Sequence, residues 1–222
     1  MLERIGGLCG LASSAVLLAY FLWNAFIVPP FSSGRAFLEF AATEPRMAFI
    51  DDWLFLAWFV LALGLLLGVH RRLAPLAPDE VILASAVGIL GLLVAIMRSV
   101  FNLGRLQVLA THFGEATETE RQTLVALLAW TEQGDVARNF ALVLVGAWVL
   151  WSASFGLRVR ALPRWVGTSG MLAGLSVIPA LIGYLTGSGV LTRPDGYLAV
   201  VFLLWTAWLA AAGLALLRGS AG

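Results

Sequence analysis

The sequence predicts an all-α integral membrane protein, a polytopic bundle of six transmembrane helices with short interfacial helices on the outer side. Of the 222 residues, 60% are hydrophobic and 12% are charged, and the mean hydropathy is +0.91. About a quarter of the residues in a water-soluble domain are charged, so such a domain is excluded. Six apolar runs have about the 20 residues that a helix needs to cross the hydrocarbon layer. Helices are favoured because lipid satisfies no backbone polar group.

The six predicted spans are separated by prolines, arginine pairs and polar runs, which are typical of turns. They comprise residues 8–28, 50–70, 81–103, 138–157, 165–186 and 197–217. We expect Pro179 to bend the fifth span. Gly64 and Gly68 have the spacing that lets membrane helices approach closely. No internal repeat or linker interrupts the pattern, so residues 1–222 are expected to form one domain.

Two shorter segments are expected to form helices on the outer side. Residues 31–44 are too polar to span the membrane, and their apolar side chains share one helical face. An amphipathic helix of this kind lies in the membrane interface. Residues 124–157 would be about 51 Å long as one helix, which is more than a crossing needs. This segment therefore either projects outward or breaks near Gly134, with a short helix at residues 124–130.

Arginine placement predicts the orientation of the bundle. If the even-numbered connections are cytoplasmic, most loop arginines fall on the cytoplasmic side. These inner arginines are Arg4, Arg71, Arg72, Arg158, Arg160, Arg164 and Arg218. Cytoplasmic loops of membrane proteins carry an excess of arginine, so we expect both termini in the cytoplasm and the protein in the inner (plasma) membrane. The expected partners are the lipid bilayer and a hydrophobic small-molecule substrate, and the oligomeric state stays open.

The composition excludes several classes of site. All 14 basic residues are arginine, so chemistry that needs a lysine amine is excluded. Cys9 is the single cysteine, which rules out a cysteine cluster or an intrachain disulfide. His70 and His112 are too few and too far apart to indicate a metal site. The net charge of +1 argues against a nucleic-acid partner. We expect neither a metal nor a cofactor.

Polar side chains of the second and third spans are predicted to meet toward the outer side. Arg98, Asn102 and Arg105 share one helical face near the end of the third span. Asp51 and Asp52 open the second span at a similar depth. Charged groups inside a membrane segment are costly, so they face the bundle interior and pair with one another. A simpler interpretation places both acids at the water interface, where the helix dipole favours them.

The start of the fourth span adds further polar side chains to this cluster. Glu132, Asp135 and Asn139 share one helical face, and Arg138 lies beside them. Opposite charges at one depth offset part of the cost of removing each other from water. A carboxyl group that keeps its proton in a dry pocket can act as a proton donor. The arginines have an alternative, because their long side chains can reach the outer surface.

Tryptophan is used heavily, with nine residues in the chain. Trp58 and Trp205 lie deeper in their spans than a belt at the membrane interface would place them. Packing between helices is the more economical interpretation of these rings. Aromatic faces also line cavities for greasy or cationic groups, and Trp58 shares a helical face with Asp51. An acid above an aromatic wall is therefore a possible arrangement.

The sequence resembles a bacterial family of six-pass membrane proteins that is known only as a domain of unknown function. The resemblance rests on the amphipathic stretch after the first helix, Arg98 with Asn102 in the third, the acid-rich start of the fourth, and residues 162–167 at the start of the fifth. It covers most of the chain and implies the six-helix architecture without an activity. The family tends to carry an Asp with a nearby His in the fourth helix, whereas residues 130–138 contain no histidine here.

These patterns favour an enzyme of the cyclase or isomerase type that acts on a lipid-soluble, isoprenoid or terpenoid-like substrate by carboxyl acid-base chemistry. Integral membrane terpene cyclases are similar in size, and their reaction needs a donating carboxyl group and aromatic faces that stabilise carbocations. The candidate catalytic acids are Asp135, Glu132, Asp51 and Asp52. The candidate substrate-binding residues are Arg98, Asn102, Arg138, Asn139, Trp58 and Trp205. A proton-coupled carrier of small solutes and a non-catalytic assembly or sensor protein are the alternatives.

Overall fold

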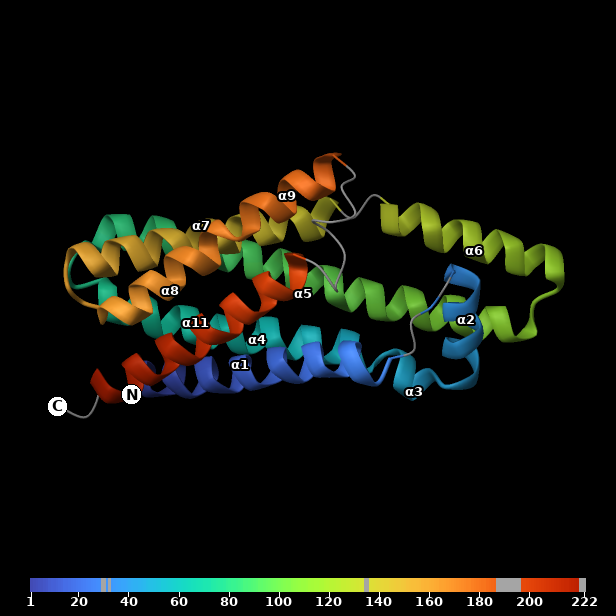
Figure 1. Ribbon diagram of the computed structural model, residues 1–222, viewed down its shortest axis with the longest axis horizontal. Coiled ribbons are helices and arrows are strands. Elements are labelled where there is room, and N and C mark those ends of the chain that lie inside the picture. The colour runs from blue at the N-terminus through green and yellow to red at the C-terminus, as the bar shows by residue number, and fades with distance from the viewer. Residues whose placement is uncertain (29–30, 32, 134–135, 187–196, 220–222) are drawn as a thin grey trace.

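Every regular element in the described part of the chain is a helix, and five of these helices are long and apolar enough to cross a membrane. The computed structural model describes residues 1–28, 31, 33–133, 136–186 and 197–219, except for a few side chains within the helices. The five long helices are α1 (Leu2–Phe26), α4 (Ile50–Leu73), α5 (Pro78–Glu115), α7 (Val136–Arg158) and α11 (Tyr197–Gly219). The predicted all-α class is thus confirmed, and the five long helices have the length and hydropathy of membrane spans. Figure 1 shows these helices aligned along the long axis of the molecule.

Helix α5 is much longer than the predicted third span. It begins with Pro78 in its first turn. Proline is tolerated there because the N–H that it lacks would have no hydrogen-bond partner within the helix. It continues to Glu115 instead of ending near residue 103, so its 38 residues extend over about 57 Å. The extra turns persist because their apolar side chains, among them Leu109 and Phe113, are buried against other helices. The prediction underestimated α5 because it measured hydropathy alone and not this amphipathic continuation.

The polar end of α5 is followed by a second helix that returns along it. Helix α6 (Glu118–Gln133) starts at a capping pair, in which the backbone N–H and the hydroxyl of Thr117 each donate to Glu120 Oε2 at 2.7 Å. It ends at Gln133, and α7 begins at Val136. The predicted break near Gly134 lies outside the described residues, and α6 starts earlier than residue 124.

A helical lobe extends from one end of the bundle. We define the lobe as α2 (Gly34–Thr43), α3 (Pro45–Ala48), residues 104–115 of α5, and α6; Figure 1 shows it at the end opposite the chain termini. Ser33 caps α2 by accepting the N–H of Ala36 at 3.2 Å. Leu38 and Ala41 on α2 are fully buried, in clusters that include side chains of α5. The predicted amphipathic helix is therefore present, but its apolar face packs on protein because α5 projects far enough to cover it.

One exposed ion pair joins α2 to α6 across the lobe. Arg35 donates to both carboxylate oxygens of Glu118, at 2.6 and 3.1 Å, and to Glu39 at 2.9 Å. These hydrogen bonds from Arg35 lower the pKa of Glu118 below its ordinary value of 4.5. A carboxyl group whose pKa is lower in the folded state stabilises the fold above the ordinary value, and loses that effect as the pH falls through the folded pKa.

We therefore predict that the lobe loosens in acid in a way that depends on Arg35. Hydrogen exchange of residues 34–43, corrected for the intrinsic effect of pH, should show protection that falls as the pH drops from 6 to below about 4.5. Arg35→Gln should lower the protection at pH 6 and flatten its pH dependence, whereas Arg46→Gln, at an exposed arginine of α3, should behave like the wild type. Equal pH profiles for Arg35→Gln and the wild type would contradict the prediction.

The predicted fifth span is divided into two helices in line, α8 (Arg164–Leu175) and α9 (Val177–Thr186). Pro179 lacks an N–H and its ring crowds the carbonyl four residues earlier, so the helix is interrupted beside Ser176. The backbone at the interruption is partly satisfied, because the hydroxyl of Tyr197 donates to the carbonyl oxygen of Ser176 at 3.0 Å. We expected Pro179 to bend a continuous helix, whereas the structure shows the helix interrupted at Ser176, about one turn before Pro179.

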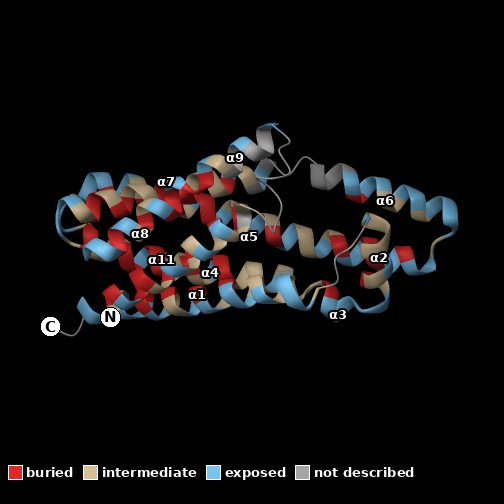
Figure 2. Ribbon diagram, viewed as in Figure 1, coloured by how far each residue is buried: buried red, intermediate tan, exposed pale blue. Residues whose placement is uncertain are grey.

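The bundle is held together by close backbone contacts at glycines. A Cβ atom on Gly6 of α1 would lie 2.6 Å from the Cα of Gly68 in α4, and one on Gly64 would lie 2.5 Å from the Sγ of Cys9. On the other side of α1, a Cβ on Gly10 would lie 3.0 Å from the Cα of Gly213 in α11. The close approach predicted from the Gly64 and Gly68 spacing is confirmed, and Figure 2 shows the buried residues concentrated between these helices.

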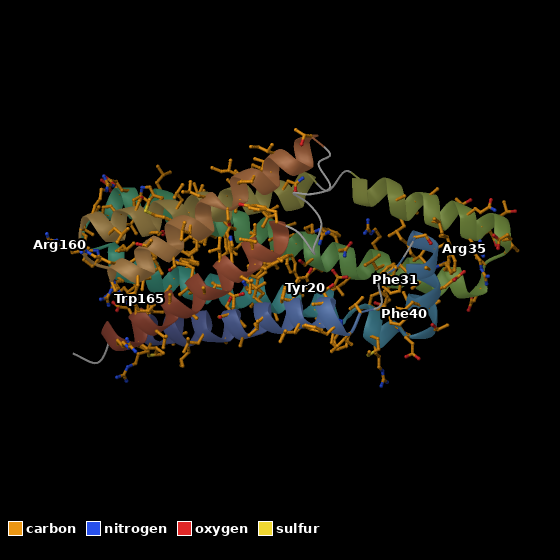
Figure 3. The ribbon with its side chains drawn as sticks, in the orientation of Figure 1. Tyr20, Phe31, Arg35, Phe40, Arg160 and Trp165 are labelled. Atoms are coloured by element: carbon orange, nitrogen blue, oxygen red, sulfur yellow. The ribbon has the colours of Figure 1, made fainter. Side chains whose placement is uncertain are left out.

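The start of α1 and the end of α11 lie together at the end of the bundle opposite the lobe, which we call the terminal end (Figure 1). Arg72 of α4 links several elements there, because it donates to Glu3 of α1 at 3.2 Å and to the carbonyl oxygen of Ala161 at 3.1 Å. Figure 3 shows Arg160 and Trp165 at this same end, far from Arg35 in the lobe. Both ends of the described chain therefore emerge on one side of the bundle.

Candidate functional site

A chain of polar side chains links α4 to α5 where the bundle meets the lobe. Asn102 donates from Nδ2 to Asp52 Oδ1 at 2.9 Å, and Arg105 donates from Nη2 to Asn102 Oδ1 at 2.6 Å. Asn102 thus uses both ends of its amide group, and Arg105 fixes the orientation in which the amide donates to the carboxylate. Arg98 and Arg105 also act electrostatically on the Asp52 carboxylate. The structure thereby brings together candidate residues from the second and third predicted spans.

The helix geometry explains why Asp52 takes this position. Asp52 lies in the first turn of α4, and Asn102 lies on the antiparallel helix α5 beside it. The short connection between α4 and α5 fixes the register, so that pairs of residues at matching distances from the turn face each other. The same register brings His70 Nδ1 within 2.9 Å of Ser85 Oγ at the other end of the pair.

Several predicted site residues cannot be placed in this cluster. Asp135 lies outside the described residues, as do the side chains of Asp51, Glu132 and Arg138. Three of the four predicted carboxylates, those of Asp51, Glu132 and Asp135, therefore belong to groups outside the described part. Within that part, the cluster contains the carboxylate of Asp52 together with the side chains of Arg98 and Arg105.

Below Asp52 the bundle interior is aromatic. Trp58 of α4 and Trp205 of α11 meet edge to face, with ring centroids 6.1 Å apart and planes at 89°. Their exposed fractions are 3% and 4%. Trp58 follows Asp52 by about 9 Å along the helix axis. Phe55 packs on Trp58 from the lobe side, and its ring also contacts Tyr20 of α1, which Figure 3 shows midway along the bundle.

Five buried polar atoms near this region have no hydrogen-bond partner in the described structure. They are Trp23 Nε1, Trp58 Nε1, Trp205 Nε1, Arg105 Nε and Asn139 Oδ1. Buried polar groups in proteins are nearly always paired, and surrounding hydrocarbon offers no substitute. Four of these atoms are N–H donors, so most of the unpartnered polar atoms of this region could donate a hydrogen bond to an acceptor.

The site has a defined chemical capacity. The carboxyl group of Asp52 can exchange a proton. Asn102 holds this carboxyl group in place and is itself held by Arg105. The indole N–H groups can donate to an acceptor. Among the described residues, no three His, Cys, Asp or Glu side chains are grouped closely enough to hold a metal ion.

Sequence reasoning missed two polar contacts that the structure shows. One is the His70 and Ser85 pair at the terminal end, and the other is the Tyr197 hydroxyl on the break at Ser176. The first was accessible, because residues equally far from the short turn between two antiparallel helices face each other. The second was not, because the packing of α11 on α8 is set by the whole bundle.

The comparisons with known proteins give no assignment for this arrangement. The sequence matches no protein-family profile, no curated protein and no solved structure. The class supported by the fold is therefore an all-helical membrane protein with a polar cluster at one end of its bundle.

Proposed function

We propose that the chain is a membrane enzyme that acts on a lipid-soluble substrate by acid-base chemistry at Asp52. One observation carries the proposal: the Asp52 carboxylate is held by Asn102 at 2.9 Å between the apolar helices α4 and α5, less than two turns along α4 from the aromatic pair of Trp58 and Trp205. Charged side chains at such positions are costly, and those that occur generally serve a function.

The geometry supports distinct roles for the residues around the carboxylate. Asn102 engages Oδ1, so the second oxygen of Asp52 can exchange a proton with the substrate. Arg105 is a positioning residue, because it holds the amide of Asn102 in its donating orientation. The faces of Trp58 and Trp205 suit a substrate carbon that gains positive charge. Cyclisation or isomerisation of an isoprenoid is the narrower form of this proposal, and it needs no cofactor.

The proposal includes six crossings and a cytoplasmic location for both termini. Two observations support an even number of crossings: Arg72 contacts Glu3 and would meet any side chain on Gly219, so both ends of the chain lie at one end of the bundle. Helices α8 and α9 in series would supply the sixth crossing. The arginine bias then places the terminal end in the cytoplasm and the lobe outside. We retain the resemblance to the bacterial six-pass family as part of this proposal.

The test is turnover by the full-length protein and its Asp52→Asn variant in nanodiscs. We predict that the wild type converts geranylgeraniol or geranylgeranyl diphosphate to a new product detected by gas chromatography and mass spectrometry. Asp52→Asn should reduce the rate by at least about a hundredfold, the usual contribution of general acid-base catalysis.

The control variant is Asp79→Asn, which changes an exposed acid in the first turn of α5 at the terminal end and should keep the wild-type rate. A thermal melt of each variant checks that the bundle is folded. Wild-type turnover by Asp52→Asn would remove Asp52 from the mechanism. No product from the wild type with either compound would contradict the isoprenoid form of the proposal.

A carrier is the second candidate, and the break between α8 and α9 is the observation that favours it. Many transporters bind their solutes at helices that are interrupted near the middle of the membrane. Here the interruption at Ser176 follows the 12 residues of α8, which is about 18 Å from the start of that helix. Proton entry into liposomes that contain a trapped pH dye separates the two functions. Proton flux that Asp52→Asn abolishes, without any new product, would favour the carrier.

A further inference from the structure

We infer that the indole N–H groups of Trp58 and Trp205 bind an uncharged oxygen, a hydroxyl or a carbonyl, of a lipid-soluble ligand. The inference names the substrate class of the proposed site, so it rests on the proposed function. A substrate with such an oxygen differs from a pure hydrocarbon, which could bind an aromatic interior without any polar contact.

The two unpartnered indole nitrogens are the first support. Both side chains are more than nine-tenths buried, and neither Nε1 atom has a hydrogen-bond partner in the described structure. The rings meet edge to face at 89°, and in such a pair one N–H can point at the face of the other ring. That contact can serve at most one of the two groups. At least one indole N–H therefore lacks an acceptor among the described residues.

The register of the helices supplies a second, independent support. The contacts of Asp52 with Asn102 and of His70 with Ser85 set α4 against α5, and they put Ile96 opposite Trp58. The contacts of Gly88 with Trp148 and of Gly91 with Val145 set α5 against α7. These two contacts place the first turns of α7 at the same height along the bundle axis as Ile96.

Asn139, in the first turns of α7, also has a buried side-chain oxygen without a partner in the described structure. The layer that holds Trp58 thus contains unpartnered polar atoms on more than one helix. A polar group bound at this depth would account for the unpartnered atoms on both helices.

The chemistry of the surroundings selects the class of ligand. An indole nitrogen donates and does not accept, so its partner must be an acceptor. The buried side chains Leu17 and Phe59 of the same cluster, and the partly buried Phe55 that packs on Trp58, are apolar and would not stabilise a phosphate or carboxylate. An alcohol or ketone oxygen meets both requirements. Trp58 lies about 9 Å along the helix axis from Asp52, so we infer that the bound oxygen is separated from the acid by several carbons of the ligand.

Matched probes test the inference directly. The probes are farnesol, which carries a hydroxyl group, and the C15 hydrocarbon 2,6,10-trimethyldodeca-2,6,10-triene, which lacks it. Binding is measured as the rise in melting temperature of the full chain in detergent over a titration of each probe. We expect farnesol to stabilise the wild type and the hydrocarbon to have little effect at the same concentration.

The variants Trp58→Phe and Trp205→Phe keep an aromatic ring and remove the N–H. Each should weaken farnesol binding by about tenfold, which corresponds to the loss of one hydrogen bond. Trp148→Phe is the matched control, because Trp148 is 2% exposed in the same aromatic core and is not among the residues with an unpartnered nitrogen. Two variants at the site keep the test decisive if one of them does not fold.

The outcomes separate this inference from the proposed function. Equal stabilisation by the hydrocarbon, no stabilisation by farnesol, or unchanged farnesol binding by both tryptophan variants would overturn the inference. The titration is repeated with Asp52→Asn, which should still bind farnesol. Tryptophan-dependent binding without turnover by any variant would support the binding site and contradict the enzyme. Turnover that depends on Asp52 but not on either indole N–H would support the enzyme and contradict the binding site.

Discussion

Replacing Gly6 with alanine is expected to destabilise the bundle by about 1–3 kcal/mol, the range found when extra atoms are forced into a packed core. The added Cβ atom would lie 2.6 Å from the Cα of Gly68, 3.0 Å from its nitrogen and 3.1 Å from the carbonyl oxygen of Gly64. All three atoms belong to the backbone of α4, so no side chain can rotate away. Helices α1 and α4 must separate, and this also disturbs the contact of Arg72 with Glu3.

The matched control is Gly104→Ala. Gly104 also lies within a helix, but a Cβ atom there would have no heavy atom within 4 Å. Alanine should be neutral or stabilise by up to about 1 kcal/mol, because it restricts the unfolded chain and favours the helix. Unfolding in mixed micelles with increasing denaturing detergent gives the free energies of unfolding. Equal stabilities of Gly6→Ala and Gly104→Ala would contradict the close packing of α1 on α4.

Replacing Phe113 with alanine is expected to destabilise the lobe by about 3–5 kcal/mol, the usual cost of removing a buried phenylalanine ring. The ring is 2% exposed and packs in a cluster with Leu38 of α2 and Leu128 of α6. The guanidinium of Arg121 lies 5.3 Å from the ring centroid, and its Nε donates to the carbonyl oxygen of Phe113 at 3.2 Å. Removal of the ring therefore leaves a cavity and also ends a cation–π contact.

Hydrogen exchange measured separately for the lobe and the bundle checks this prediction. Residues 34–43 and 118–133 should lose protection, while α1 and α4 keep theirs because their core is a different cluster. Val108→Ala, on an exposed side of the same helix, should change the protection of the lobe very little. Loss of protection throughout the bundle would show that the lobe and the bundle unfold together.

The candidate site was partly accessible from the sequence. Arg98, Asn102 and Arg105 could be assigned to one face because helix periodicity depends only on their spacing. The choice between Asp51 and Asp52 could not be made, since consecutive residues of a helix point about 100° apart and the rotation of α4 was unknown. The contact of Trp58 with Trp205 depends on how α11 lies against α4, which no local pattern specifies. The acids Glu132 and Asp135 remain predictions.

The sequence by itself determined the class of protein, most of the helix positions and the close packing at Gly64 and Gly68. These features depend on hydropathy, on the need of lipid-exposed backbone to bond internally, and on residue spacing, all of which are local. The tertiary structure alone decided two others: the extension of α5 to Glu115 with the lobe built on it, and the contact of Asp52 with Asn102. Each depends on contacts between residues that are distant in the chain, and such contacts exist only after the helices have packed.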